Sequence, residues 1–376
     1  MKRADADIAI VGAGIIGAAC ADALTACGLR VTVVECEAIG SGATAAGMGH
    51  LVVMDDNPAE LALTRYSLAL WRTLTARGTE RHEYRNCGTL WIAADEEEWE
   101  AARSKQQTLQ SQDIASEMLD ASALYAAEPH LRPGLAGALR VPGDGIVYPP
   151  KTARFLLEQA SARGARLVSA RASAIHEDGV LLEDGSVAHA RIVLVANGAA
   201  ALSLCPELPM RPKKGHLVIT DRYPGMVRHQ LVELGYIKSA HAGEGDSVAF
   251  NVQPRPTGQL LIGSSRQFGA MGKAVNMHIV SRMLAHAAEF MPMLAQLNAL
   301  RCWTGFRAAS SDGLPLIGPH PGRSNVWLAT GHEGLGITTS LATAALIAAQ
   351  LTGTQTAIPI EPYLPSRFPE LAQAHG

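Results

Sequence analysis

Residues 7–37 constrain the fold of this chain more than any other stretch. They read DIAIVGAGIIGAACADALTACGLRVTVVECE, in which an apolar run ends at Val11 and a G-x-G-x-x-G motif follows at once. An alanine-rich segment then reaches Gly28, and a second apolar run ends at Glu35. This order of strand, glycine-rich turn, helix, strand and acid is typical of a βαβ unit that binds a dinucleotide.

Each part of the motif has a physical role in binding a dinucleotide. Gly12 permits the tight turn after the strand, Gly14 lets the backbone approach a pyrophosphate, and Gly17 lets the helix pack closely on the strand. The N-terminus of the helix offers N–H groups and a partial positive charge to the phosphates. Glu35 can accept hydrogen bonds from a ribose, and an acid at this position favours FAD or NAD over NADP.

The composition limits what else the chain can be. A length of 376 residues predicts about two domains, and the 48 % of hydrophobic residues suffices for sizeable cores. A net charge of −3 without a basic block argues against nucleic acid as a partner. The six cysteines show no metal-ligand spacing, so we expect no metal site. The most apolar stretch, 341–351, is too short to span a bilayer, and without a signal-peptide pattern we expect a cytoplasmic location.

Three further stretches combine glycines with small or hydroxyl-bearing residues. Residues 40–50 form a loop after the second strand, residues 193–199 form a strand that ends in Asn197-Gly198, and residues 329–338 lead from a strand into a helix. Backbone with few side chains suits close approach to a large planar cofactor. The second strand-to-helix junction favours FAD over NAD, because a flavin also needs positive potential near the N1–C2=O end of its ring system.

The pattern of elements predicts an α/β fold, with a Rossmann-like FAD-binding domain and a second sheet-based (α+β) substrate domain. We expect the FAD-binding domain to combine residues 1–80, 141–205 and 301–376, because every glycine-rich loop lies there. Residues 81–140 and 206–300 then form the substrate domain. Helices are expected over 58–78, 95–112, 152–163, 276–290 and 339–351, and strands over 8–11, 31–34, 166–169, 191–196, 216–220, 247–252, 259–262 and 326–329.

Together these motifs resemble the D-amino-acid oxidase (DAO) superfamily of FAD-dependent oxidoreductases, which includes glycine oxidase, sarcosine oxidase and D-amino-acid dehydrogenase. The resemblance spans nearly the whole chain, through six segments in family order: GAGIIG with Glu35, GSGATAAGMG at 40–49, VLVANGA at 193–199, WTGFRAASSDGLPLIG at 303–318, ATGHEGLGIT at 329–338 and PIEPYLPSRF at 359–368. Within the family, GMGHLVVMDD at 47–56 and GHEGLGITTS at 331–340 are most similar to catalytic subunits of the D-hydroxyproline dehydrogenase, opine oxidase and hydrogen cyanide synthase type.

The resemblance implies oxidation of a D- or achiral amino or imino acid, such as D-hydroxyproline, D-proline, glycine or sarcosine, by hydride transfer from Cα to flavin N5. Arg307 takes the place of the carboxylate-binding arginine in the family's G-x-R-P motif, although Ala308 replaces the proline. Its planar guanidinium suits a bidentate contact with a carboxylate. His50 and His332 flank the flavin-facing loops and are candidates for substrate contact. Cys302 is not at the spacing of the family's linking cysteine, so we expect non-covalent FAD.

The predicted cofactor-binding residues come from all of these segments. They are Gly12, Gly14, Ile15, Ile16, Gly17, Glu35, Cys36, Ser41, Gly42, Thr44, Gly47, Met48, Gly49, Ala174, Ala196, Gly198, Gly305, Gly331, Gly334, Leu335, Gly336, Ile337 and Thr338. The substrate pocket is expected to draw on the 206–300 segment, where the candidates are Lys214, His216, Tyr236 and Arg266.

Two other functions stay open from the sequence. An NAD-linked Rossmann dehydrogenase would explain residues 7–37 but neither later glycine-rich loop, and a flavin-binding subunit without its own substrate site would not need Arg307. The resemblance also implies electron transfer to partner subunits, and the chain has no cysteine spacing for an iron–sulfur cluster of its own. No lysine lies in a motif that would place it over the flavin. We therefore expect a dehydrogenase, rather than an oxidase, with an electron-transfer partner.

Overall fold

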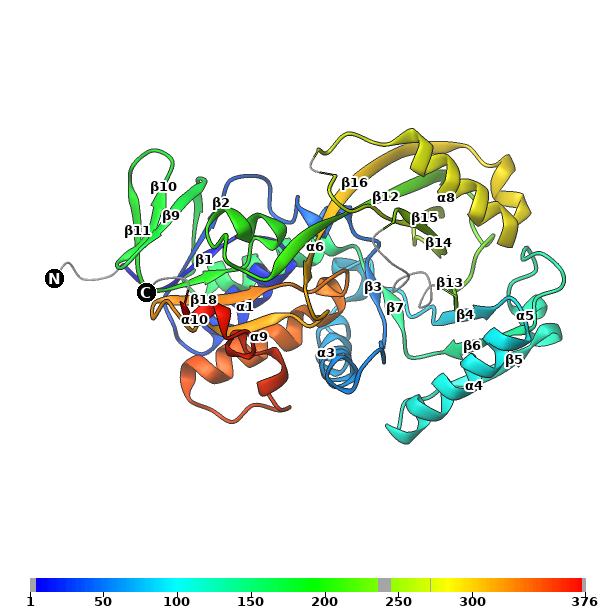
Figure 1. Ribbon diagram of the computed structural model, residues 1–376, viewed down its shortest axis with the longest axis horizontal. Coiled ribbons are helices and arrows are strands. Elements are labelled where there is room, and N and C mark those ends of the chain that lie inside the picture. The colour runs from blue at the N-terminus through cyan, green and yellow to red at the C-terminus, as the bar shows by residue number, and fades with distance from the viewer. Residues whose placement is uncertain (1–4, 236–244, 271, 374–376) are drawn as a thin grey trace.

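The computed structural model describes residues 5–235, 245–270 and 272–373. It contains two large sheets, one near the chain termini and the other on the opposite side (Figure 1). A short antiparallel ladder of β3 (His50–Leu51) and β7 (Gly145–Ile146) forms a third, two-stranded sheet. The predicted α/β fold, with a Rossmann-like sheet and a second sheet-based part, is confirmed.

The first sheet is built around the predicted βαβ unit. β1 (Ala6–Val11) pairs in parallel with β2 (Val31–Glu35) on one side and with β11 (Val187–Val195) on the other. The strand order is β17–β18–β11–β1–β2–β8, and the near-continuous burial of β1 and β2 is typical of a parallel sheet covered on both faces. The remaining strands are β8 (Arg166–Ser169), β9 (Ala172–His176), β10 (Gly179–Leu182), β17 (Leu316–Pro319) and β18 (Val326–Thr330).

Four long helices accompany this sheet. α1 (Ile15–Ala26) packs against both α6 (Pro149–Ala162) and α9 (Gly336–Thr352), and α3 (Pro58–Thr75) packs on α9. The sequence predicted α6 only from Thr152, whereas the helix begins at Pro149. The two prolines occupy the first helical turn, where a missing N–H removes no intrahelical hydrogen bond.

The second sheet has the strand order β16–β12–β15–β14–β13–β4–β6–β5. Helix α8 (Met277–Phe290) packs on one of its faces, and together they bury a cluster that includes Val218, Phe250, Val252 and Ile262. The strands are β4 (Thr89–Ala93), β5 (Glu117–Asp120), β6 (Gly137–Val141), β12 (Met210–Arg222), β13 (Gln230–Glu233), β14 (Ser247–Pro254), β15 (Gln259–Arg266) and β16 (Ala299–Ser310). The other helices are α2 (Ala43–Ala46), α4 (Glu96–Ser111), α5 (Ala121–Ala127) and α10 (Glu370–Gln373), with 3-10 turns at Thr79–Arg81, Gly198–Ser203, Pro292–Gln296, Glu361–Tyr363 and Pro365–Arg367.

The other face of the second sheet is turned toward the 40–50 loop. Residues that alternate with the α8-facing ones, Leu217 on β12 and Leu261 on β15, form a separate buried cluster with Met48. Because side chains alternate between the two faces of a strand, this cluster identifies which residues of the sheet look toward the cofactor loops.

Strand β16 crosses the domain boundary that the sequence predicted at residue 301. It pairs with β12 along its length, from Met210 opposite Ser310 to Thr220 opposite Ala299. β16 is therefore an edge strand of the second sheet. Most of the strand nevertheless lies in the segment from residue 301 that the sequence assigned to the FAD-binding domain. The division of the chain into two domains stays a prediction.

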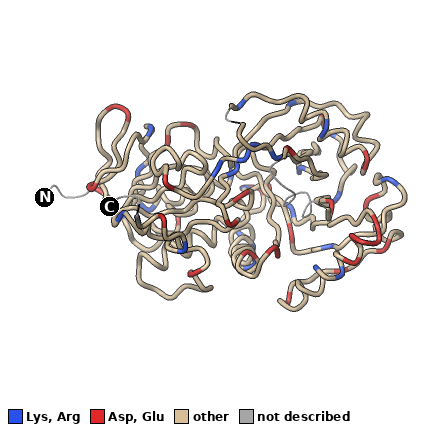
Figure 2. Tube along the Cα trace, viewed as in Figure 1, with Lys and Arg blue, Asp and Glu red and all other residues tan. Residues whose placement is uncertain are grey.

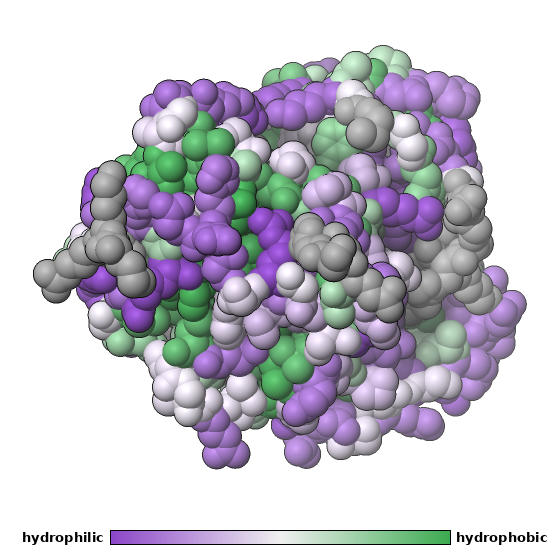
Figure 3. All heavy atoms as spheres, turned by 60° about the vertical axis from the view of Figure 1, so that its left-hand side comes forward, coloured by the Kyte–Doolittle hydropathy of each residue, from purple (hydrophilic) through white to green (hydrophobic). Residues whose placement is uncertain are grey.

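The surface carries charges of both signs. Acidic residues gather at α4, whose first turn holds Glu96, Glu97 and Glu98 after the capping Asp95 (Figure 2). On the face shown in Figure 3, hydrophilic and hydrophobic residues alternate over short distances. Within the described ranges, no helix combines the length and the hydropathy needed to cross a membrane.

Candidate active site

The turn between β1 and α1 has no room for side chains. Gly12 has a φ of +106°, and a Cβ on it would lie 2.8 Å from Asn197 Cα at the end of β11. A Cβ on Gly17 would lie 1.9 Å from Gly12 O. These contacts bring the predicted residues Ala196 and Gly198 to the same turn, because Ala196 N donates to Val11 O at 2.9 Å.

Glu35 closes one side of this turn. Its Oε2 accepts a hydrogen bond from Ala13 N at 2.7 Å, and its Oε1 accepts one from Glu37 N at 2.8 Å. A carboxylate offers about four lone-pair sites, so two acceptor positions stay available to a ribose. The carboxylate thus both stabilises the turn and offers the predicted ribose contact.

The 40–50 loop lies directly over the start of α1. Thr44 Oγ1 accepts a hydrogen bond from Ile15 N at 2.9 Å, and a Cβ on Gly14 would approach the same oxygen to 3.2 Å. A Cβ on Gly47 would lie 2.7 Å from Ile337 Cδ1 of α9. The structure therefore brings three of the predicted cofactor segments into contact.

The start of α9 meets the other end of this loop. Thr338 Oγ1 donates to His50 O at 2.9 Å, and Trp71 Nε1 donates to Thr338 O at 3.0 Å. Neither Gly14, the N-cap of α1, nor Leu335, the N-cap of α9, gives its helix a side-chain cap. The N-cap residues of these two packed helices thus supply no side-chain acceptor, although Thr44 Oγ1 from the 40–50 loop accepts from Ile15 N, the first N–H of α1.

This arrangement fits a flavin dinucleotide. The cradle at Gly12 and Gly14 suits the pyrophosphate, since the N-terminus of a helix attracts anions. The buried Asn197 Oδ1 has no partner among the described residues and lies beside the same turn, as an acceptor for a ligand donor. The start of α9 would supply the second positive end that the N1–C2=O region of a flavin requires.

Other predicted cofactor residues have different surroundings. Cys36, Ser41 and Gly42 are exposed, and Ser41 Oγ donates to Glu37 Oε2 at 3.2 Å. Ala174 lies in β9 opposite Leu181, and Ala170 N, just before that strand, donates to Glu35 O at 3.0 Å. A Cβ on Gly305 would lie 2.3 Å from Ala46 Cβ, which brings β16 against the loop.

Arg307 lies where the second sheet meets the loop before α9. Its Nη1 donates to Ser265 O at 2.9 Å, and a Cβ on Gly215 would lie 2.7 Å from that nitrogen. Its Cδ lies 3.5 Å from the Cβ position of Gly334. Gly215 and Gly334 thus make room for the guanidinium, and Arg307 as a whole is partly exposed.

The two histidines differ in their partners. His50 Nε2 lies 3.4 Å from Met48 Sδ, and burial lowers the pKa of His50 to about 4. His332 Nε2 lies 3.0 Å from Thr343 Oγ1 within the core, and burial lowers its pKa to about 3. Both rings are neutral near neutral pH, and the hydrogen bond of His332 ties the loop to α9.

The other pocket candidates lie mostly on the α8 side of the second sheet. His216 Nδ1 lies 3.0 Å from Ser265 Oγ, and His216 Nε2 accepts from Asn276 N at 3.1 Å. Lys214 Nζ donates to Ala274 O at 2.5 Å. Arg266 pairs with Ser247 across β14 and β15. Tyr236 lies outside the described residues.

Sequence reasoning missed three polar residues on the face turned toward Met48. Asn251 and Gln253 of β14 and Trp303 of β16 each carry a buried polar atom that has no partner among the described residues. For the two β14 residues the signal in the sequence was the alternation of 250–253, where Asn251 and Gln253 alternate with Phe250 and Val252.

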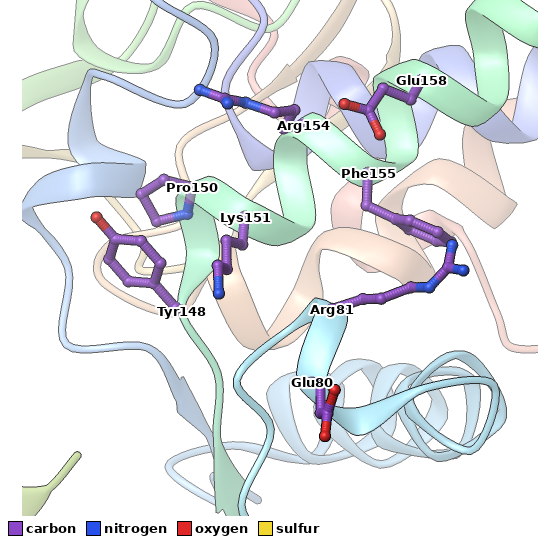
Figure 4. A pocket seen from close by; sticks show the side chains of 8 residues that line it. All are labelled: Glu80, Arg81, Tyr148, Pro150, Lys151, Arg154, Phe155 and Glu158. Carbon is purple, nitrogen blue, oxygen red and sulfur yellow. The ribbon is translucent and has the colours of Figure 1, made fainter. Parts of the chain in front are cut away.

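A surface cleft of about 490 Å³ lies elsewhere, between the 3-10 turn at Thr79–Arg81 and the start of α6. Arg81 extends over the ring of Phe155 at 5.6 Å (Figure 4). None of the predicted site residues lines this cleft. No cluster of three or more potential metal ligands occurs in the described part of the chain.

Replacing Glu35 with alanine is expected to weaken dinucleotide retention without unfolding the protein. The change removes the ribose acceptor and two hydrogen bonds to the turn, at a cost of about 1.5–3 kcal/mol for a charged acceptor. Cofactor content after dialysis measures the effect, with Glu35→Gln as the matched control that keeps one acceptor oxygen. Full occupancy in Glu35→Ala would show that the ribose assignment is wrong.

Comparisons with known proteins identify the family and the cofactor. A family model described as FAD dependent oxidoreductase (DAO) matches residues 7–350. The chain is 29 % identical to a glycine oxidase of Pseudomonas aeruginosa, over 96 % of this chain and 98 % of that protein. It is 27 % identical to hydrogen cyanide synthase subunit HcnC of the same species, over 96 % of each. The crystal structure of glycine oxidase from Geobacillus kaustophilus has a TM-score of 0.86 at 28 % identity, and the match covers 96 % of this chain and 99 % of that one. The chain therefore belongs to the DAO family of FAD-dependent oxidoreductases, and FAD is its cofactor.

Proposed function

We propose that this enzyme oxidises a small D- or achiral amino or imino acid to its imine, and that Arg307 binds the substrate carboxylate. The observation that carries the proposal is the position of Arg307, partly exposed between the second sheet and the loop before α9. The glycine oxidases among its relatives support a small amino acid as substrate. With FAD as the cofactor, the NAD-linked alternative is set aside.

The residues of this chain then have separate tasks. FAD, when bound, would supply the two-electron oxidant for the substrate. Arg307 orients the substrate through its carboxylate, which directs Cα toward the cofactor loops. Met48, Leu217 and Leu261 provide an apolar wall that excludes water from the reacting atoms. The low pKa values of His50 and His332 keep positive charge away from the amine.

The substrate within this class is proposed from the narrower resemblance. D-hydroxyproline, D-proline, glycine and sarcosine are the candidates. The test adds each compound, and an opine, to the purified yellow protein without oxygen and follows bleaching of the flavin absorption. Bleaching by at least one member is the expected result. A flavin that none of them reduces would favour the alternative, a flavin-binding subunit without a substrate site.

We further propose that electrons leave through a partner subunit. The similarity to a hydrogen cyanide synthase subunit supports this arrangement. Dye reduction should therefore be faster than oxygen consumption on the same purified chain. Peroxide production at a rate that matches dye reduction would identify a self-sufficient oxidase.

A further inference from the structure

A row of buried polar side chains crosses the second sheet. Asp144, Thr89, Gln230 and Gln253 are all 0 % exposed. Thr89 of β4 lies opposite Gln230 of β13, and the register of β13 against β14 places Gln230 opposite Gln253. The row runs from the loop before β7 to Gln253, whose Nε2 donates to Met48 O.

Carbonyl acceptors fix the orientation of both amides. Gln230 Nε2 donates to Gly145 O at 3.0 Å, and Gln253 Nε2 donates to Met48 O. A carbonyl oxygen only accepts hydrogen bonds, so the atom that faces it must be the amide nitrogen. The other amide atoms, Gln230 Oε1 and Gln253 Oε1, are therefore acceptors.

These two oxygens and Asp144 Oδ2 are buried and have no hydrogen-bond partner among the described residues. Three acceptors in one row require donors, because an unpartnered buried polar atom loses its hydration without compensation. Water molecules and the hydroxyl of a protonated Asp144 are the donors that can supply these bonds.

Asp144 is the only acid of the row. Its Oδ1 accepts from Val53 N at 3.1 Å, and burial raises its pKa to about 7 against the lowering effect of the Thr89 hydroxyl. The charged and titratable groups that face it from the neighbouring elements are Lys105, Arg72, Tyr84 and Cys87. Its neighbours Pro142 and Gly143 are partly exposed, which gives a proton a short way to solvent.

We propose that Asp144, Thr89, Gln230 and Gln253, with water between their acceptors, form a proton path from the substrate site to Asp144. The inference rests on the proposed function. When an ammonium substrate becomes an iminium ion, the Cα–H bond breaks and its electron pair and proton pass to FAD as hydride. The nitrogen forms the C=N bond and loses one further proton. The path carries that proton to the Asp144 carboxylate, which becomes a carboxylic acid and then releases it to solvent.

The test measures anaerobic flavin reduction of the holoenzyme against pH in H₂O and D₂O, with the fastest compound of the substrate panel as probe. In the unmodified enzyme the rate should rise with pH through about 7, because Asp144 accepts a proton only when ionised. The Asp144→Asn variant should lose this rise of the rate with pH. Above the pH range of the rise, its flavin should be reduced roughly tenfold more slowly than that of the unmodified enzyme. Gln253→Met and Gln230→Leu should change the solvent isotope effect and leave FAD content intact.

Glu60→Gln is the matched control. Burial also raises the pKa of Glu60 to about 7, and its Oε1 is likewise unpartnered among the described residues, but it lies in the first turn of α3, outside the row. This variant should keep the rise of the flavin-reduction rate with pH. If Asp144→Asn fails to fold, the two glutamine variants carry the test.

The proposed proton path would be contradicted if Asp144→Asn, or both glutamine variants, kept the pH dependence of the reduction rate and the solvent isotope effect of the unmodified enzyme. If no panel compound reduces the flavin, the proposed function fails, and infrared spectroscopy of the oxidised holoenzyme still tests the path. The spectra are compared in the Glu60→Gln background, because Glu60 is another buried carboxyl whose pKa is raised to about 7. In Glu60→Gln a carboxylic-acid C=O band should fade as the pH rises through about 7, and adding Asp144→Asn should remove that band. Absence of the band from Glu60→Gln, or its persistence in the double variant, would contradict a protonated Asp144.

Discussion

Replacing Arg307 with alanine is expected to raise the KM for the amino acid roughly a hundredfold while FAD stays bound. A charge-assisted, bidentate contact with a carboxylate is worth about 3 kcal/mol, and tenfold in affinity corresponds to about 1.4 kcal/mol. Arg307 Nη1 donates to Ser265 O on the second sheet, away from the turn at Gly12, so we expect the substitution to leave that turn intact. Steady-state kinetics and the visible spectrum of the same preparation measure both effects.

Two further variants make this experiment specific. Arg307→Lys should restore only part of the affinity, because an ammonium group cannot form the planar fork. Arg301→Ala is the matched control, since Arg301 lies on the same strand, is exposed and stacks over the Trp303 ring at 5.6 Å. Equal KM values for Arg307→Ala and Arg301→Ala would remove Arg307 from the substrate site.

Replacing Gly17 with alanine is expected to yield protein with little FAD and a lower Tm. The new Cβ would lie 1.9 Å from Gly12 O, so α1 must move away from the turn at which we expect the pyrophosphate to bind. Overpacking of this kind costs roughly 1–3 kcal/mol, and here the obstacle is backbone, which cannot rotate aside. Flavin content and thermal unfolding of the purified variant measure the effect.

Gly28→Ala provides the control at the other end of the same helix. A Cβ on Gly28 meets no atom within 4 Å, and only its φ of +80° is strained for alanine. That strain costs about 1–2 kcal/mol of stability and should leave FAD content unchanged. Full FAD occupancy in Gly17→Ala would contradict the close packing at the turn.

The local part of this architecture was predictable because its signals lie close together in the chain. Residues 7–37 contain both strands, the helix and Glu35 of the βαβ unit, and the structure shows the steric reason for Gly12 and Gly17. The starts of two helices were also predicted closely: Asp95 and Asn276, the first residues expected to be helical, are the N-caps of α4 and α8, and their side chains accept N–H bonds there.

Long-range pairing was not predictable from such signals. β16 contains the motif with Gly305 and Arg307, and only its ladder with β12 shows that it belongs to the second sheet. The face that each side chain occupies depends on that register. Because this register could not be predicted, His216 was proposed for the pocket, whereas its ring accepts a hydrogen bond from Asn276 N at the start of α8. For the same reason Gln253, whose amide donates to Met48 O, was overlooked.

The central claim is that Arg307 and the FAD loops form one carboxylate-binding site, and a spectral titration tests it most directly. Acetate, which carries a carboxylate but no oxidisable amine, is added to holoenzyme and to Arg307→Ala holoenzyme of equal flavin content. We expect a saturable shift of the flavin absorption in the unmodified enzyme and a strongly weakened one in the variant. Identical titrations in the two proteins would contradict the account, because Arg307 would then lie outside the site that the flavin senses.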